Sequence, residues 1–581
     1  MTDKRSEPST VPSGTTGTSL GNSQRNASSG ESSSLSRIDD SDSWRIGGPG
    51  SLPAWPLTTI YRPQDIDHEL AEAALDISLS HLNNAKIPYE HASVCRRATT
   101  GQPASSSDVT ILIRAPFKAR LSELVSLLDD ILQVLLGLNF DGRVEIIDPL
   151  ACGGLKTFAP VLSQQQQEGW NHTITRVTDA LEQTGVDWRL AFAANRGYFF
   201  EESKLSVVVK ASKFNPGHPE MSRLREELAD HGFKLALMGV EGLWGLFGAL
   251  AAGVGDDAVR NNLGWPISPS YHGMGLSIGR ASDASGRFST LGGYIKLRSN
   301  NEEHTVGLTC YHGVRPEEGN PGETDMDRRG ATGLSWPCHS PAPCDIQMFA
   351  EPLRKLVETP IPQSLPPPIK AEEESKLQES RRKLQEIERF DPFIGNVSAV
   401  SGWRNRQIEE KKLDAPFLFT DWACVTISKG HCPYPANAIH RQRQRLLEKF
   451  PEALDSWKTD KSTVNKVAPL PHEDAVIFKQ GRTTGLTAGT LAGVLPASYR
   501  LDGLPGHIHH RAFIVVASPH RQQFALPGDS GAWCLDGNGD LVGQLVGGDK
   551  ETGAGLMIPF SVILNDIEMK LGLEPGSVSL A

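Results

Sequence analysis

From about residue 265 onward the chain is a succession of short apolar runs separated by glycine-rich turns, and this pattern constrains the fold most strongly. Runs of this length bounded by glycine are typical of β-strands rather than helices. Many short strands in succession predict an all-β region closed into barrels. A helix is expected after them, at 562–571. The runs are GMGLSIG (273–279), STLGGYIKLR (289–298), TVGLTCYH (305–312), WACVTIS (422–428), GTLAGVL (489–495), AFIVVAS (512–518), LVGQLVGG (541–548) and GAGLMIPF (553–560).

The preceding part of the chain has a different pattern. Between about residues 60 and 255 strand-like runs alternate with helical ones, as in VTILI (109–113) followed by LSELVSLLDDILQVLLGL (121–138). This order predicts an α/β or α+β domain over residues 55–260. It contains no GxGxxG or GxxxxGK[ST] loop, so no nucleotide chemistry and no function are assigned to it. Residues 1–54 are rich in Ser, Gly, Thr and Asn, which predicts a disordered tail.

Composition narrows the class of protein. A chain of 581 residues predicts two or three domains, and apolar and charged fractions of 38% and 22% suit a soluble protein. The net charge of −11 argues against a nucleic-acid partner. The first residues carry no apolar signal segment and the cysteines form no CxxC pair, which predicts an intracellular, cytoplasmic protein without a metal site.

One segment requires a membrane check. Residues 235–255, LALMGVEGLWGLFGALAAGVG, carry a single charge, at Glu241, and are long enough to span a bilayer. The central glutamate and the many glycines favour a buried strand followed by a short helix. A membrane partner is therefore not expected.

A long interruption is expected within the β region, at about 317–412. It contains the proline run 366–368 and the charged segment KAEEESKLQESRRKLQEIER (370–389). Within that segment, Glu372–Lys376 and Glu379–Lys383 have the i,i+4 order that stabilises a helix. The segment predicts a solvated helix lying lightly on the barrel, and a partner-binding or regulatory insertion is the alternative.

The strongest chemical signal is PGDSGAW (527–533). Glycines on both sides of Ser530 permit a tight backbone path that exposes the hydroxyl. Such a path can also direct backbone N–H groups toward one point, where they stabilise the oxyanion formed when a carbonyl is attacked. A serine is a weak nucleophile and needs a histidine base held by an acid.

Both partners are present upstream. His312 ends the strand-like run GLTCYH, and Asp421 precedes the apolar run WACVTIS, where a carboxylate can be buried. Each alone has an ordinary structural explanation, as a satisfied histidine or a strand cap. The order His, Asp, Ser in fitting local contexts predicts a catalytic triad of His312, Asp421 and Ser530.

These motifs resemble the trypsin-like (chymotrypsin-fold) serine peptidase superfamily, and in particular its intracellular fungal multidomain type. The matching pieces run in family order over about residues 270–570. They are SIG (277–279), TLGGYI (290–295), LTCYHGV (308–314), DWACV (421–425), GRTTGLTAGTL (481–491), PGDSGAW (527–533) and LVGQLVGG (541–548). The predicted fold is multidomain, with a C-terminal double barrel over 261–581.

The resemblance implies two six-stranded barrels with the triad between them, His312 and Asp421 from the first and Ser530 from the second. It also implies an oxyanion hole formed by the backbone N–H groups of Gly528 and Ser530. The substrate channel would be lined by Val546, Gly547 and Gly548, a strand that pairs with an extended peptide.

Three departures from the family pattern leave questions open. The stretch between His312 and Asp421 is long, so another acid such as Asp414 stays an alternative. Phe524, at the expected base of the primary pocket, argues against a preference for basic side chains. In secreted relatives the acid equivalent to Asp529 is neutralised by a new N-terminus after activation cleavage. Here either the oxyanion hole is preformed, or processing ahead of the SIG segment activates the enzyme.

The sequence therefore predicts a serine endopeptidase that needs no cofactor and acts on protein or peptide substrates. A regulatory protein partner is expected at the α/β domain or the helical insertion. The alternative is a catalytically latent or inactive protease fold that serves as an interaction scaffold. An α/β-hydrolase esterase is disfavoured because that fold orders its triad Ser, Asp, His.

Overall fold

The computed structural model describes residues 37–38 and 44–50, most of 57–245, and much of 273–581. Within the last range the larger undescribed stretches are 317–329, 408–416, 429–436, 439–454 and 501–509. Residues 1–36 and 246–272 also lie outside the described residues, so the tail predicted there stays a prediction.

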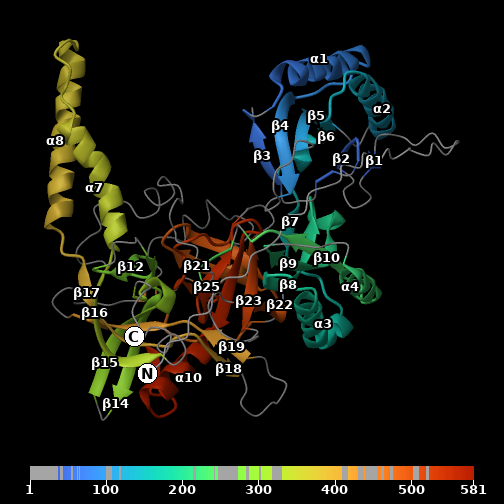
Figure 1. The fold of residues 1–581 in the computed structure, drawn as a ribbon. Helices are drawn as coiled ribbons and strands as arrows, with labels where there is room; N and C mark the ends of the chain where they lie inside the picture. The colour runs from blue at the N-terminus through green and yellow to red at the C-terminus, as the bar shows by residue number, and fades with distance from the viewer. Residues whose placement is uncertain are drawn as a thin grey trace, which may run out of the picture.

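A closed antiparallel barrel forms the C-terminal core (Figure 1). In order round the ring its strands are β21 (Val476–Gly481), β22 (Gly485–Tyr499), β23 (His510–Ala517), β26 (Ala554–Pro559), β25 (Leu541–Asp549) and β24 (Trp533–Leu535), which pairs back to β21. Its interior is apolar, with Val515, Leu545 and Met557 fully buried. The sequence pattern of short strands and glycine turns therefore predicted this region correctly.

A second sheet curls round beside it. In order its strands are β12 (Ser277–Arg280), β16 (Ala331–His339), β17 (Phe393–Val400), β20 (Ala423–Ile427), β15 (Glu302–Thr309), β14 (Gly293–Ser299) and the C-terminal β27 (Val578–Leu580). The short β13 (Ser289–Thr290) directly precedes β14 in the chain and pairs with β12. Strands β13 and β14 are neighbours in the chain but lie near opposite ends of this sheet, so the sheet curves into a half-barrel. The closed barrel and this half-barrel confirm the predicted chymotrypsin-like fold.

Helix α10 (Phe560–Leu571) follows β26 directly and buries Ile563 and Ile567. It ends at Gly572, whose φ of 65° lies in the left-handed region that favours glycine. Two further strands, β18 (Arg404–Gln407) and β19 (Phe417–Thr420), form a hairpin, and β19 contacts β23 in parallel. The helix expected near 562–571 is therefore present.

The insertion is shorter than the predicted 317–412, because β16 and β17 are barrel strands. Between them, α7 (Pro343–Glu358) and α8 (Pro367–Arg389) form a hairpin that projects from the body of the protein (Figure 1). Only Ile387 of α8 is buried, while Glu372–Lys376 and Glu379–Lys383 are ion-paired as expected. The sequence of β16 lacks a regular strand pattern. That strand carries bulges in its pairing with β17, and these disrupt the apolar alternation.

The N-terminal region begins with a sheet covered on one face by helices (Figure 1). Its strands, in order, are β1 (Arg37–Ile38), β2 (Arg45–Gly48), β6 (Arg143–Ile147), β5 (Val109–Arg114), β4 (His91–Thr99) and β3 (Leu57–Tyr61), and its helices are α1 (His68–Asn84) and α2 (Leu121–Gly137). Ile111 and Ile113 pack under the helices, while Leu112 belongs to a separate cluster with Trp44 and Tyr198.

Two strands of this sheet come from the segment predicted as disordered tail, 1–54. The structure corrects the boundary, because β2 pairs with β6 and buries Ile46 completely. Arg45 lies beside the buried Glu145, which also binds Arg97. Average composition over 54 residues concealed the short run WRIGG (44–48), whose burial depends on a distant partner strand.

A second N-terminal unit joins the barrel. It consists of β7 (Lys156–Phe158), β8 (Trp188–Gly197), β9 (Lys204–Ala211) and β10 (Lys234–Met238), with α3 (Gln164–Gln183) and α4 (Pro219–Asp230). β8 pairs with β22, so the two sheets are continuous. The indole N–H of Trp170 donates to the carbonyl of Pro496 at 3.1 Å. The predicted α/β character of this region is confirmed.

The apolar segment 235–255 contributes β10 and a short strand, β11 (Leu243–Gly245), and the helix expected after them lies outside the described residues. Among the helices that the structure describes, none is long and apolar enough to cross a membrane.

Candidate active site

His312 and Asp421 lie side by side at the ends of paired strands. β15 pairs with β20, with Thr309 opposite Ala423, and the two side chains follow and precede these residues in the chain. Nδ1 of His312 is 2.5 Å from Oδ2 of Asp421, and the backbone N–H of His312 donates to Oδ1 at 3.1 Å. The carboxylate is fully buried and the imidazole is 15% exposed. A buried carboxylate on Nδ1 keeps the proton there and leaves Nε2 available as a base.

Cys310 and Gln544 surround this pair. The Cys310 thiol donates to the carbonyl of Leu545 at 3.3 Å, and the Gln544 amide donates to the carbonyl of Asp421 at 3.4 Å. Burial, and then the charge of Asp421, raise the pKa of the Cys310 thiol well above its usual value. The thiol therefore stays neutral, and Asp421 remains the site's acidic group on this side.

Potential metal ligands meet at the same place. In the described part of the chain the one such group is Cys310, His312 and Asp421, whose ligand atoms lie within 4.8 Å of one another. A metal is bound by a thiolate rather than a thiol, and the raised pKa of Cys310 opposes its ionisation. The three residues do not fit a metal centre well, and the absence of a cofactor stays a prediction.

The Ser530 loop depends on two glycines with positive φ. Gly528 and Gly531 have φ of 97° and 91°, which L side chains rarely adopt. A Cβ on Gly531 would lie 2.2 Å from the carbonyl oxygen of Thr290, and one on Gly528 would lie 2.5 Å from the ring of Phe288. Both glycines of the motif are therefore required for the tight path expected from the sequence.

Strand β13 connects the Ser530 loop to the first barrel. The Ser530 carbonyl accepts hydrogen bonds from Thr290 N at 2.6 Å and from Ser289 Oγ at 2.7 Å. A Cβ on Gly313, the neighbour of His312, would lie 2.2 Å from the Ser289 Cβ. The structure thus brings Ser530 close to the His312–Asp421 pair. Among the described residues, however, no hydrogen bond joins Ser530 Oγ to the imidazole.

The N–H groups of Gly528 and Ser530 have no acceptor within the described residues. The neighbouring N–H groups are engaged: Asp529 N donates to Leu526 O at 3.0 Å and Gly531 N to Leu545 O at 2.7 Å. Two unengaged donors on either side of Asp529 are the arrangement that an oxyanion hole requires.

Asp529 itself is completely buried and points away from these donors. Its carboxylate accepts from Thr483 N at 2.8 Å, Thr484 Oγ1 at 2.7 Å and Lys479 Nζ at 3.0 Å. Lys479 is as fully buried as Asp529. Sequence reasoning missed Lys479, because one lysine in the run VIFKQG gives no local sign of its distant partner.

The expected substrate strand is already paired. The end of β25, Gly547 to Asp549, runs antiparallel to β11, with Trp244 opposite Gly548. A Cβ on Gly548 would lie 2.8 Å from the Trp244 ring. The N-terminal region also contacts the end of this strand through Lys210, whose ammonium is 3.1 Å from Asp549 and 2.5 Å from Glu551. Sequence reasoning did not anticipate either contact.

Phe524 is fully buried inside the second barrel. Its ring faces Gly489 of β22 and Gly555 of β26, where an added Cβ would lie 2.8 and 2.9 Å from it. The Lys479 ammonium is 5.6 Å from the ring centroid. The alternative acid Asp414 lies outside the described residues.

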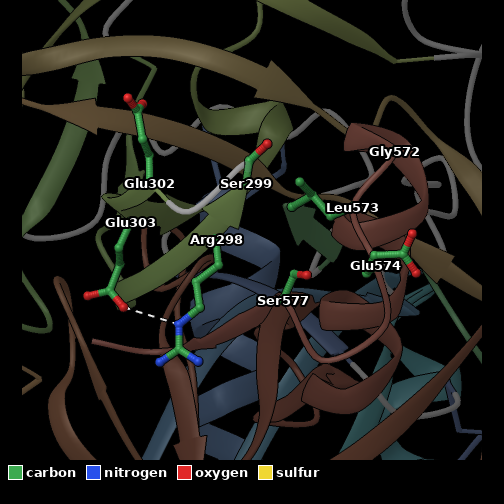
Figure 2. A pocket seen from close by; sticks show the side chains of 8 residues that line it. All are labelled: Arg298, Ser299, Glu302, Glu303, Gly572, Leu573, Glu574 and Ser577. Atoms are coloured by element: carbon green, nitrogen blue, oxygen red, sulfur yellow. Dashed lines mark hydrogen bonds and ion pairs between the residues drawn. The ribbon is translucent and has the colours of Figure 1, made fainter.

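One cavity of the described part of the chain lies away from these residues. A hollow of about 460 Å³ lies between the β14–β15 turn and the loop after α10, and Figure 2 shows the side chains that line it. Its Arg298 and Glu303 are ion-paired at 3.2 Å. None of the predicted catalytic or substrate residues lines this hollow, so it is not part of the candidate site.

The model of Peptidase family S64 matches residues 451–570. This segment contains Ser530, Gly528 and β25, but neither His312 nor Asp421. No curated protein matches the chain.

Several solved serine proteases are similar to about half of the chain. A glutamic-acid-specific serine protease is 11% identical over 53% of this chain and 100% of its own, with a TM-score of 0.25. Thermobifida fusca protease A is 13% identical over 53% and 97%, with a TM-score of 0.25. Nocardiopsis protease is 13% identical over 50% and 94%, with a TM-score of 0.22. Similarities this low do not by themselves establish the fold or the function of this chain.

The strand topology and the family match together confirm the resemblance to trypsin-like, chymotrypsin-fold serine peptidases. Within that class, the segment around Ser530 is similar to peptidase family S64. A fungal and intracellular type stays a prediction.

Proposed function

We propose that this protein is a serine endopeptidase in which Ser530 is the nucleophile, His312 the general base and Asp421 its orienting acid. The observation that carries the proposal is the 2.5 Å contact between His312 Nδ1 and the buried Asp421 carboxylate, beside the glycine-flanked loop of Ser530. A buried acid on one imidazole nitrogen leaves the other to accept a proton.

In this mechanism Nε2 of His312 accepts the Ser530 proton as Oγ bonds to the peptide carbonyl carbon. The carbonyl oxygen becomes an oxyanion held by the N–H groups of Gly528 and Ser530. His312 then returns the proton to the leaving amine as the C–N bond breaks. Water hydrolyses the acyl-enzyme by the same proton transfers in reverse. The Ser530–His312 hydrogen bond would form on substrate binding, since such bonds are often long in free enzymes.

An extended peptide is the proposed substrate form. The edge of β25 at Gly547 and Gly548 accepts an antiparallel strand from within this chain, which supports the same pairing with a peptide. The residue at the expected base of the primary pocket is Phe524, which is apolar and carries no negative charge to attract a basic side chain. We therefore expect uncharged or apolar side chains, rather than basic ones, next to the cleaved bond.

A catalytically latent protein is the second candidate, and one observation favours it. β11 occupies the edge of β25 that a substrate would use. Lys210 holds Asp549 at the end of the same strand, so the N-terminal region contacts the cleft in two places. The fold would then present the N-terminal unit or the α7–α8 hairpin to a regulatory protein.

Fluorophosphonate labelling of the full chain tests the proposal. The wild type is compared with Ser530→Ala and His312→Ala, and with Ser380→Ala, which changes a serine on exposed α8. We expect a tag on Ser530 in the wild type and in Ser380→Ala. Ser530→Ala should carry no tag, and His312→Ala should react slower by a factor on the order of a million, with mass spectrometry locating the adduct.

The opposite outcomes are distinct. A tag on another residue that survives Ser530→Ala would overturn the assignment of the nucleophile. A folded wild-type chain that stays unlabelled would favour the latent candidate.

A further inference from the structure

The buried acid beside the nucleophile has an internal counter-charge. Asp529 separates the two proposed oxyanion donors, Gly528 and Ser530, and its carboxylate has no exposure to solvent. Burying an ionised carboxylate is costly unless a cation and hydrogen-bond donors compensate it. In the described part of the chain that cation is Lys479, 3.0 Å from Oδ2.

Lys479 is committed to this contact. It lies in the middle of β21, and its side chain is completely buried. Besides Asp529, its ammonium donates to Thr484 Oγ1 at 2.5 Å. Thr484 Oγ1 in turn donates to the same carboxylate oxygen at 2.7 Å. Lysine, threonine and aspartate thus form a closed group that links the β21–β22 turn to the Ser530 loop.

The same turn sets the direction of the Gly528 N–H. Thr483 Oγ1 donates to the carbonyl of Pro527 at 2.6 Å. In a planar trans peptide the carbonyl and the following N–H point in opposite directions. The N–H of Gly528 therefore points away from Thr483, and Thr290 Oγ1 holds the Gly528 carbonyl at 2.8 Å.

In the structure the SIG segment (277–279) is not available to neutralise Asp529. Ile278 is fully buried in the core of the first barrel, and it pairs with Ser289 in the β12–β13 ladder. Asp529 is satisfied in an uncleaved chain without any contact from residues 277–279.

We propose that Lys479 is a positioning residue whose ammonium fixes Asp529, and through it the Gly528 and Ser530 N–H groups, so that the oxyanion hole is formed without a new chain terminus. The inference rests on the proposed function and extends it to activation. It decides between the two hypotheses for Asp529 in favour of a preformed hole.

The test compares the full-length wild type with Lys479→Met and with Arg97→Met. Arg97 is the matched control, because it is a buried cation paired with the buried Glu145 in the N-terminal sheet, remote from the site. The probes are fluorophosphonate and p-nitrophenyl acetate, with circular dichroism to establish folding. We expect Lys479→Met to lower kcat about a hundredfold, the usual effect of losing one oxyanion donor, while KM changes less than about threefold. Arg97→Met should keep wild-type kcat.

Lys479→Met leaves a buried charge unpaired, so a second variant guards against misfolding. Lys479→Met with Asp529→Asn removes both charges. It should fold, and it should still label at least about tenfold slower than the wild type, because the loop loses its anchor.

Each outcome has one meaning. A reactive wild type with an equally reactive Lys479→Met, or an equally reactive double variant, overturns the inference alone. An unreactive wild type overturns the proposed function and this inference with it. If cleavage instead supplied a new α-amino group that neutralises Asp529, the activity of the cleaved enzyme would not change in Lys479→Met.

Discussion

The two barrels contribute two buried aspartates to one site, and they are neutralised in opposite ways. In the first barrel Asp421 faces His312, whose ring is partly exposed to solvent. In the second barrel Asp529 faces Lys479, whose side chain is completely buried. The proposed mechanism requires this difference. The first pair must change its charge in each catalytic cycle, and the second must keep the Ser530 loop unchanged.

The largest effect is expected from changing the acid of the first pair, Asp421. Asp421→Asn keeps the size of the side chain, but its amide would donate to Nδ1 and select the wrong imidazole tautomer. We expect kcat to fall about ten-thousandfold, measured with p-nitrophenyl acetate at pH 7. Circular dichroism should show an unchanged fold. A fall of less than tenfold would mean that another acid, such as Asp414, orients His312.

A smaller effect is expected in the second barrel from Thr483→Val. This substitution keeps the shape of the side chain and removes the hydroxyl that holds the Pro527 carbonyl. One hydrogen bond is worth about 1 kcal/mol, so kcat should fall roughly fivefold to tenfold. The change should appear in kcat rather than KM, because the oxyanion exists only in the transition state. An effect confined to KM would show that Thr483 acts on substrate binding.

The smallest effect is expected at Cys310, beside the first pair. Burial and the charge of Asp421 raise the pKa of this thiol well above its ordinary value, so it stays protonated at pH 8. Iodoacetamide reacts with the thiolate. The native chain should therefore remain unmodified at Cys310 and keep its activity, and the urea-unfolded chain should be alkylated. Alkylation of Cys310 in the native chain at the rate of the unfolded one would contradict the burial of this thiol beside Asp421.

The two halves also differ in how they contact the N-terminal region. The second barrel is joined to it by the β8–β22 pairing, by Trp170 on Pro496, and by β11 on the edge of β25. The first barrel instead carries the α7–α8 hairpin, which is anchored by a buried ion pair between Asp345 and Arg482 of the second barrel. Arg482 adjoins Thr483 in the turn that holds Asp529. The insertion is therefore tied to the same turn as the proposed oxyanion hole.

Local features were readable from the sequence alone. Glycine-bounded apolar runs predicted most strands of both barrels, because strand alternation and turn residues are properties of a few neighbouring positions. PGDSGAW predicted the Ser530 loop for the same reason, since two glycines confer backbone freedom wherever they occur. His312 and Asp421 do contact each other in the structure, and their catalytic roles stay a prediction. The predicted extents of the tail (1–54) and of the insertion (317–412) were wrong. Both include strands, at 37–48 and at β16 and β17, that form only by pairing with strands distant in the sequence.

Tertiary structure alone decided the partners of the buried groups. The contact of Lys479 with Asp529 spans 50 residues of chain, and β11 lies beside a strand about 300 residues further on. Neither contact has a local signature, because an isolated lysine or a short apolar run can be satisfied in many ways. Strand register and barrel closure select one of them. The sequence by itself thus determined the local backbone features around the proposed catalytic residues, and long-range pairing determined which charged groups lie beside them.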